Sequence, residues 1–168
     1  MPNVLYQFLA KDHDRLDDLF HLAVRDGSRS DLAAYEEFRK GLFRHISIEE
    51  KIVYPTVLNL LGVRSDPVIA QLRLDHSAVV MLLVPVPSPS IFVTLSTILA
   101  AHNELEEQAG GVYELLGRLP ESRSHEMLEQ FRYAPDVPLQ PLKPLAQVIG
   151  SVQRVVERSG HKFIDPKD

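Results

Sequence analysis

The chain has no cysteine among its 168 residues. This absence excludes disulfides, thiolate-bound metals, iron–sulfur clusters and thiol catalysis, so any metal must be held by nitrogen and oxygen atoms. It also fits a reducing compartment, and we expect a cytoplasmic protein. Seven histidines and 23 Asp and Glu residues supply the nitrogen and oxygen atoms that such a site needs.

Basic clusters and long apolar runs are also missing. The net charge is -5, and Lys and Arg do not gather in one stretch, so we expect no nucleic-acid partner. The longest apolar run, residues 78–84, is far too short to span a bilayer. The first residues, MPNVLYQFLAKDHD, lack the basic start and apolar run of a signal peptide, and we expect no membrane association.

Apolar residues recur at helical spacing in four stretches, which predict helices at about 3–25, 32–61, 67–83 and 88–118. Pro55 should kink the second helix, Gly110-Gly111 should weaken the fourth locally, and residues 26–30 read as a loop. The expected caps are Asn3, Ser30 or Asp31, Asp66, and Ser88 or Ser90. Short connections favour antiparallel neighbours, so the fold class is all-α, an up-down-up-down four-helix bundle.

The character of the chain changes after the fourth helix. We assign residues 1–119 to the bundle and residues 120–168 to a C-terminal extension. The extension should contain a short helix at 121–131, a proline-rich connector at 134–144 and an amphipathic helix from Leu145. The apolar stripe of that last helix must be buried on the bundle or on a partner subunit, and the second arrangement would give a homodimer.

Two copies of one motif carry the chemistry. His45-Ile-Ser-Ile-Glu49-Glu and His102-Asn-Glu-Leu-Glu106-Glu each place an imidazole and a carboxylate four residues apart, on one face of a helix. A lone histidine with an acid before it precedes each copy. The candidate metal ligands are therefore one histidine from each helix and one carboxylate from each of two helices: His13, His45, Glu49, His76, His102 and Glu106.

Each part of this pattern has a plainer explanation. A lone histidine is more often a surface or core residue, and one HxxxE pair is often an exposed helix pair. The combination points to a metal site, because two buried carboxylates at equivalent positions would repel without a cation between them. A pair of divalent ions resolves that charge, with the carboxylates bridging and two imidazoles completing each end.

The other polar residues near the motifs receive less weight. The acids beside the ligands point about 100° away from them, so solvation or ion pairing is favoured over orienting the imidazole of a neighbouring helix. Three tyrosines are expected to be packing residues, and three further histidines are not expected to bind metal. These residues are Asp12, Glu50, Asp75 and Glu107; Tyr35, Tyr54 and Tyr113; and His21, His125 and His161.

The order His, HxxxEE, His, HxxxEE, with the proline of EEKIVYP after the first acidic pair, resembles the hemerythrin-like (HHE cation-binding) proteins over roughly residues 4–118. The resemblance implies a non-haem centre of two iron ions with an oxo or hydroxo bridge; zinc or manganese are the alternative metals. It also implies that Glu49 and Glu106 bridge the ions. His13 and His45 would complete one end, and His76 and His102 the other.

The sequence departs from the oxygen-carrying hemerythrins in two respects. Those proteins place two histidines four apart on the third helix, whereas here Leu72 and Val80 flank His76 at that spacing. Either water fills the missing position or the site is more open, which disfavours reversible oxygen carriage. The acid of the fourth helix also follows His102 by four residues, where the carriers have five. The cysteine-bearing segment of the related iron–sulfur repair proteins is missing.

These residues lead to three functional hypotheses. The first is a di-iron protein that binds a small ligand (oxygen, nitric oxide or peroxide) for sensing, detoxification or iron handling. The second is a di-iron oxidoreductase, such as a ferroxidase or a peroxide or nitric-oxide reductase, although no proton donor or electron-entry route is visible. The third is a regulatory helical module with a structural metal site that works through its C-terminal helix. Whether the protein is an enzyme stays open, and no catalytic residue is assigned.

Overall fold

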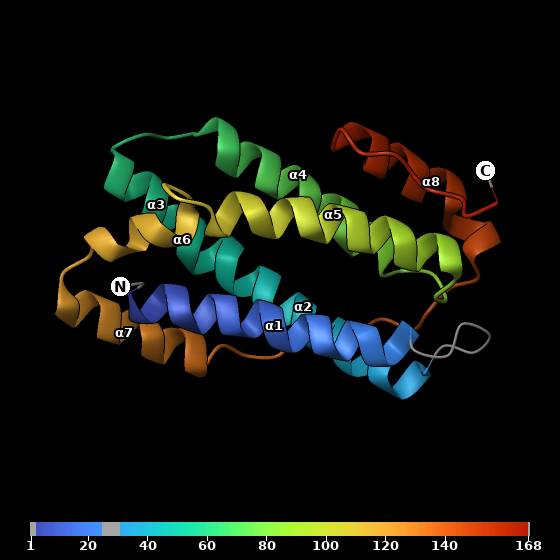
Figure 1. Cartoon of the computed structure of the whole chain (residues 1–168), viewed down its shortest axis with the longest axis horizontal. Coiled ribbons are helices and arrows are strands. Elements are labelled where there is room, and N and C mark those ends of the chain that lie inside the picture. The colour runs from blue at the N-terminus through green and yellow to red at the C-terminus, as the bar shows by residue number, and fades with distance from the viewer. Residues whose placement is uncertain (1–2, 25–30, 168) are drawn as a thin grey trace.

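Four antiparallel helices form the body of the computed structural model, which describes residues 3–24 and 31–167 (Figure 1). The chain runs along the bundle, back, along and back again, so the expected up-down-up-down bundle with a helical C-terminal segment is confirmed. The predicted loop at 26–30 lies outside the described residues. The α-helices are α1 Val4–Val24, α2 Leu32–Ile48, α3 Tyr54–Leu61, α4 Pro67–Leu82, α5 Pro89–Glu107, α6 Val112–Leu115, α7 Glu121–Arg132 and α8 Leu145–Arg158.

Side-chain caps begin the four long helices of the bundle. The Asn3 side chain accepts hydrogen bonds from two backbone N–H groups of α1, and Asp66 does the same for α4. Asp31 caps α2, and Ser88 caps α5. Each cap satisfies N–H groups that have no partner inside the helix, which is why these polar residues mark the helix starts in the sequence.

The predicted second helix is divided by a π-helical turn at Glu49–Val53, which joins α2 to α3. The turn begins at Glu49 itself, six residues before the proline that was expected to disturb the helix. The N–H of Tyr54 bonds the carbonyl of Glu49, five residues earlier. A π turn inserts one extra residue into the helix and is common at functional sites. The irregularity therefore begins at the last residue of the HxxxE motif.

The predicted fourth helix is interrupted rather than weakened at its two glycines. The helix α5 ends at Glu107, Gly110 has a left-handed φ of 78°, and α6 begins at Val112. A 3-10 turn at Leu116–Arg118 follows. At Gly111 a Cβ would lie 2.6 Å from the Glu106 carbonyl oxygen, so no side chain fits there. The expectation of one continuous helix to Arg118 is wrong, because glycine here permits a sharp turn and not only a weaker helix.

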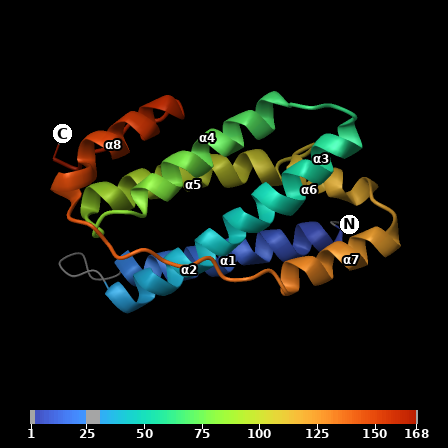
Figure 2. The ribbon, with the colours of Figure 1, turned by 180° about the vertical axis from the view of Figure 1, so that it is seen from behind.

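Both helices of the C-terminal extension pack against the bundle. The helix α7 lies against α1, and α8 lies against α4 (Figures 1 and 2). Between them the extended connector forms one bridge, in which the Lys143 and Val84–Val86 backbones exchange hydrogen bonds. Val152 and Val156 of the predicted stripe are buried in the same core cluster as α4. None of the described helices combines the length and apolar character of a membrane span.

Two apolar clusters occupy the two ends of the bundle. One gathers residues such as Phe20, Phe38 and Phe92 and is covered by α8. The other gathers residues such as Leu9 and Leu72 and is covered by α6 and α7. In each long helix, the residues between the two clusters carry the histidines, so the polar site lies in the middle of the bundle.

Candidate metal centre

Four imidazoles from four helices meet at the centre of the bundle. The histidines are at most 7% exposed and lie on α1, α2, α4 and α5. Each occupies a core-facing position of its helix, where helical periodicity would otherwise place an apolar residue. These residues are His13, His45, His76 and His102.

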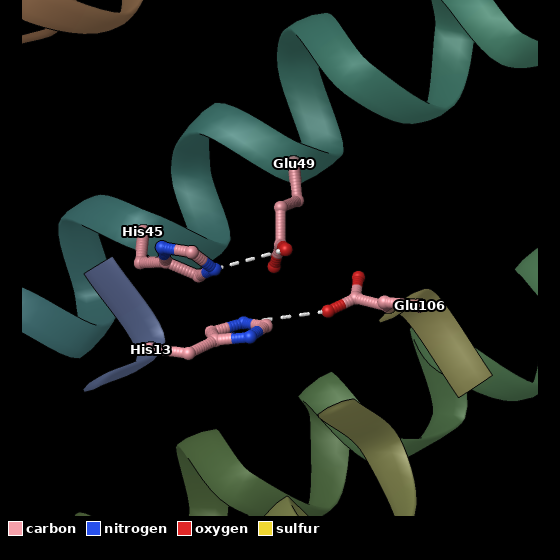
Figure 3. Close-up of side chains that lie close together, drawn as sticks. All are labelled: His13, His45, Glu49 and Glu106. Carbon is pink, nitrogen blue, oxygen red and sulfur yellow. Dashed lines mark hydrogen bonds and ion pairs between the residues drawn. The ribbon is translucent and has the colours of Figure 1, made fainter. Parts of the chain in front are cut away.

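Two fully buried carboxylates lie between the imidazoles. The two oxygens of Glu49 face different helices: Oε1 lies 3.0 Å from His45 Nε2, and Oε2 lies 3.1 Å from His76 Nε2. The Oε2 atom of Glu106 lies 3.5 Å from His13 Nε2 and 3.4 Å from His102 Nε2. Figure 3 shows Glu49 and Glu106 facing each other across the site, with His13 and His45 beside them. Both carboxylates therefore connect the two ends of the site.

The donor atoms form two groups that share Glu49. One group contains His13, His45, Glu49 and Glu106, and the other contains Glu49, His76 and His102; within each group the donor atoms lie within 4.8 Å of one another. The tertiary structure thus brings together all six residues selected from the sequence. Their donors, four Nε2 atoms and two carboxylates, suit iron, zinc or manganese. Their role as ligands stays a prediction.

The acids that directly precede or follow the six central residues in the sequence contact the Nδ1 atoms of the imidazoles, on the side away from the centre. Asp12 on α1 lies 2.9 Å from Nδ1 of His45 on α2, and Glu50 of the π turn lies 2.7 Å from Nδ1 of His76 on α4. A carboxylate can only accept, so Nδ1 donates to the outer acid, and Nε2 is the nitrogen that would bind a metal in exchange for any proton it holds. This arrangement is the one that metal-binding histidines commonly have.

Two further pairs close the set into a ring around the bundle. Asp75 on α4 faces His102 on α5, with Oδ2 3.5 Å from Nδ1, and Glu107 on α5 lies 2.6 Å from Nδ1 of His13 on α1. Each helix therefore contributes an acid that faces the histidine of the next helix. The sequence analysis gave this orienting role less weight than solvation, because spacing alone does not show what a neighbouring helix presents.

The pKa values of the outer pairs follow from burial and charge. Burial lowers the pKa of His45, but the carboxylates of Glu49 and Asp12 outweigh burial and raise the pKa to about 10. Burial raises the pKa of Asp12, yet His45 and Arg15 lower it to about 2. For His102 burial dominates and the pKa is lowered, despite the facing Asp75. The attraction between Asp75 and His102 is therefore weaker than the attraction between Asp12 and His45.

The two central carboxylates have opposite pKa shifts. Burial raises the pKa of Glu49, but His45 and His76 outweigh it and hold the pKa well below its usual range. Burial and the charge of Glu49 raise the pKa of Glu106 well above its usual range. One buried carboxylate is thus stabilised by imidazoles, and the other would hold a proton when no cation is present. This arrangement of charge fits a cation at the centre.

Two tyrosines expected to serve only in packing reach into this centre. The Tyr54 hydroxyl donates to Glu106 at 2.7 Å, and the Tyr113 hydroxyl lies between the two carboxylates, where it donates to Glu49 and lies 2.9 Å from Glu106. Tyr113 also lies 3.1 Å from His13 Nε2. The glycine turn brings Tyr113 back toward Glu106, which a continuous helix would not do. A Val-Tyr pair follows the acidic pair in both motif copies, and this shared feature could have identified both tyrosines.

The positions four residues from His76 are apolar in the structure as well as in the sequence. Leu72 is fully buried in one apolar cluster, and Val80 packs against the other. Packing thus accounts for both side chains. Of the remaining histidines, His21 and His125 are exposed, whereas His161 contacts Asp75.

A cavity of about 280 Å³ adjoins the centre. All four imidazoles border it, together with an apolar wall that includes Leu42, Val79 and Leu99. Exposed residues of α1 and α5, among them Asp17 and Ala100, border its other end. The cavity therefore connects the surface between these helices to the imidazoles, with room for a small molecule.

Residues 4–84 match the family model of the hemerythrin HHE cation binding domain. This segment is therefore similar to the hemerythrin-like proteins. The match covers His13, His45, Glu49 and His76 and ends directly after α4, so it is shorter than the resemblance expected from the motifs. His102 and Glu106 of the hemerythrin-like bundle are joined to it by geometry alone. No curated protein and no solved structure matches the chain.

Proposed function

We propose that the protein holds two iron ions and binds a small ligand, namely oxygen, nitric oxide or peroxide, for sensing, detoxification or iron handling. The observation that carries the proposal is the pair of donor groups that share Glu49, beside a cavity that reaches the surface. The family match supports binding of a metal cation. Iron at this site would supply one-electron redox chemistry and Lewis acidity.

Each of the two ions would be held by two histidines, and the two glutamates would lie between the ions. His13 and His45 would complete one end of the site, and His76 and His102 the other, with the carboxylates of Glu49 and Glu106 between them. The outer acids accept hydrogen bonds from Nδ1 of His13, His45 and His76, so that Nε2 of these residues points inward toward a metal. For these three histidines the orientation costs little on binding, because the outer hydrogen bonds already exist in the folded chain.

The size of the cavity favours a small ligand, since its volume is about 280 Å³. Phe20, Phe38 and Leu42 form an apolar part of its wall, polar residues such as Asp14 and Asn103 form the rest, and imidazoles border it at the centre. The apolar part limits water near the imidazoles and strengthens electrostatic interactions there. A diatomic molecule or a peroxide fits this space.

The second candidate, a di-iron oxidoreductase, gains support from the tyrosines. Reductive chemistry on peroxide or nitric oxide consumes protons, and the Tyr54 and Tyr113 hydroxyls donate directly to Glu106 and Glu49. The phenols can therefore hold protons at the carboxylates. The third candidate, a regulatory module, has less support, because the apolar face of α8 is already covered by α4.

The deciding experiment measures iron per chain and the absorption spectrum after anaerobic loading and exposure to air. We expect two irons and charge-transfer absorption that reductant bleaches and air restores. Glu49→Ala should bind at most one iron, whereas Glu104→Ala, which changes an exposed acid of α5, should match the wild type. Circular dichroism checks that both variants fold. One zinc, or no metal at all, in the wild type contradicts the proposal, and steady turnover of peroxide or nitric oxide would favour the oxidoreductase.

A further inference from the structure

One of the four outer acid–imidazole pairs is incomplete. In three pairs the carboxylate lies 2.6, 2.7 or 2.9 Å from Nδ1, but Asp75 and His102 are 3.5 Å apart. The Nδ1 atom of His102 is buried and has no hydrogen-bond partner within the described part of the chain. A buried donor without a partner is costly, so the separation needs a physical cause.

The cause is competition for Asp75. Its Oδ1 atom accepts a hydrogen bond from Gln71 Nε2 at 2.8 Å and another from His161 Nε2 at 3.0 Å. Asp75 is only 1% exposed, so water does not replace these partners. Two donors pull the carboxylate away from His102, and they also reduce its strength as an acceptor for His102.

A turn at the end of α8 places His161 beside Asp75. After α8, Gly160 adopts a left-handed φ of 85°, and the N–H groups of Gly160 and His161 bond the carbonyls of Glu157 and Val156. This pattern is a Schellman cap, which reverses the chain at a helix end. The reversed segment lies back along the bundle (Figures 1 and 2).

Further contacts hold the reversed segment in position. Gln71 donates to the Ser159 carbonyl at 2.8 Å, so the residue that binds Asp75 also binds the end of α8. Phe163 packs against the apolar cluster beneath α8. The N–H of Ile164 donates to Thr94 Oγ1 on α5 at 3.0 Å. His161 is therefore fixed between two helices that carry candidate ligands.

We propose that the C-terminal segment controls the metal site through His161, which holds Asp75 back from His102 and thereby weakens metal binding by Glu49, His76 and His102. The inference rests on the proposed function, since it concerns the same site. His161 is a positioning residue that acts through Asp75. The group it affects already has fewer donor residues than the group of His13, His45, Glu49 and Glu106. The two ions are therefore held unequally, and release of the segment strengthens the weaker half.

The test titrates metal-free protein with cobalt(II) under anaerobic conditions and follows the two binding steps by absorption. In His161→Leu, Asp75 is free to reach His102, and the weaker step should tighten by about tenfold, the usual size of an outer hydrogen bond to a metal-binding histidine. The stronger step should not change. His161→Gln keeps an N–H donor and should resemble the wild type, and so should His125→Leu, which changes an exposed histidine of α7.

A second variant and a second readout keep the outcome clear. Gln71→Leu removes the other competing donor and should tighten the same step. In the metal-free protein, the ¹⁵N and ¹H signals of His102 Nδ1 should show a new hydrogen bond in His161→Leu. An unchanged or weakened second step together with an unchanged His102 signal would overturn the inference. If the wild type binds fewer than two ions, the proposed function fails, while the His102 signal still tests the link from His161.

Discussion

At the scale of single residues, the centre depends on paired roles. Each helix of the bundle supplies an inward imidazole and an acid that faces the imidazole of the next helix; the acid directly precedes the histidine or directly follows a central glutamate. A helical rotation of about 100° per residue explains how neighbours in sequence serve two different histidines. The pairs were visible in the sequence as Asp-His and Glu-Glu, but their partners were not, because a partner on another helix leaves no local pattern.

The ring leads to a prediction for Asp12. Asp12→Ala removes the acceptor of His45 Nδ1, so the imidazole loses its orientation and part of its basicity. We expect metal affinity, measured by competition with a chelator, to fall about 10- to 100-fold. Asp18→Ala, an exposed acid of the same helix, should leave the affinity unchanged. Equal affinities for the two variants would show that Asp12 is only an ion-pair partner of Arg15.

The tyrosines give a second prediction at this scale. Tyr113→Phe removes the donor to the buried and charged carboxylate of Glu49, and hydrogen bonds to charged groups contribute about 1.5–3 kcal/mol. The metal-free protein should lose about that much free energy of unfolding in urea.

The matched control is Tyr35→Phe, because the buried Tyr35 hydroxyl has no hydrogen-bond partner among the described residues. That variant should be neutral or slightly more stable. A loss as large as that of Tyr113→Phe would mean that removing any buried hydroxyl has the same cost here, which would remove the special role of Tyr113.

At the scale of elements, two irregularities shape the centre. The π turn at Glu49–Val53 lies in one motif copy, and the turn at Gly110-Gly111 follows the other. Each places a tyrosine, Tyr54 or Tyr113, against a central carboxylate. Regular helices would carry these side chains past the site, so the departures from regular helix complete its polar shell.

The glycine turn can be tested directly. In Gly111→Ala the new Cβ would meet the carbonyl oxygens of Glu106 and Gln108 at 2.6 and 2.7 Å, and backbone atoms cannot move away cheaply. We expect a loss of about 1–3 kcal/mol in the free energy of unfolding, together with weaker metal binding as Glu106 shifts.

Gly150→Ala is the control, because a Cβ there meets only the distant end of the Arg154 side chain and improves helix propensity. It should be neutral or stabilise the protein by about 0.5–1 kcal/mol. A Gly111→Ala protein with wild-type stability and metal affinity would show that the turn does not position Glu106.

At the scale of the whole molecule, the two apolar clusters hold the polar centre between them. The C-terminal extension covers both clusters with its helices, α7 at one end and α8 at the other. The division of the chain at residue 119 stays a prediction, but the extension shares its core with the bundle. The cavity is also a property of the assembled helices, since its lining comes from α1, α2, α4 and α5.

The route to the centre gives the last prediction. Leu99 is half-buried on α5 and borders the cavity, so Leu99→Phe should partly fill it. Nitric oxide should then bind the iron-loaded protein about tenfold more slowly, which corresponds to roughly 1.4 kcal/mol in the barrier, with iron content unchanged. Stopped-flow absorption measures the rate. Val93→Phe, at an exposed position of α5, should match the wild type, and equal rates in both variants would exclude this route.

The sequence by itself determined the bundle and the six central residues. Helical periodicity, caps and the HxxxE spacing are local signals, so they can be read before the helices are packed. Only the tertiary structure showed the outer acid–imidazole pairs, the contacts of Tyr54 and Tyr113 with the six central residues, and the contact of His161 with Asp75. Those contacts join residues as many as 100 positions apart or depend on a backbone turn, and no pattern along one helix records them. The six central residues could be predicted from the sequence because their spacing is that of a helix, whereas the contact of His161 with Asp75 could not, because that contact exists only in the folded chain.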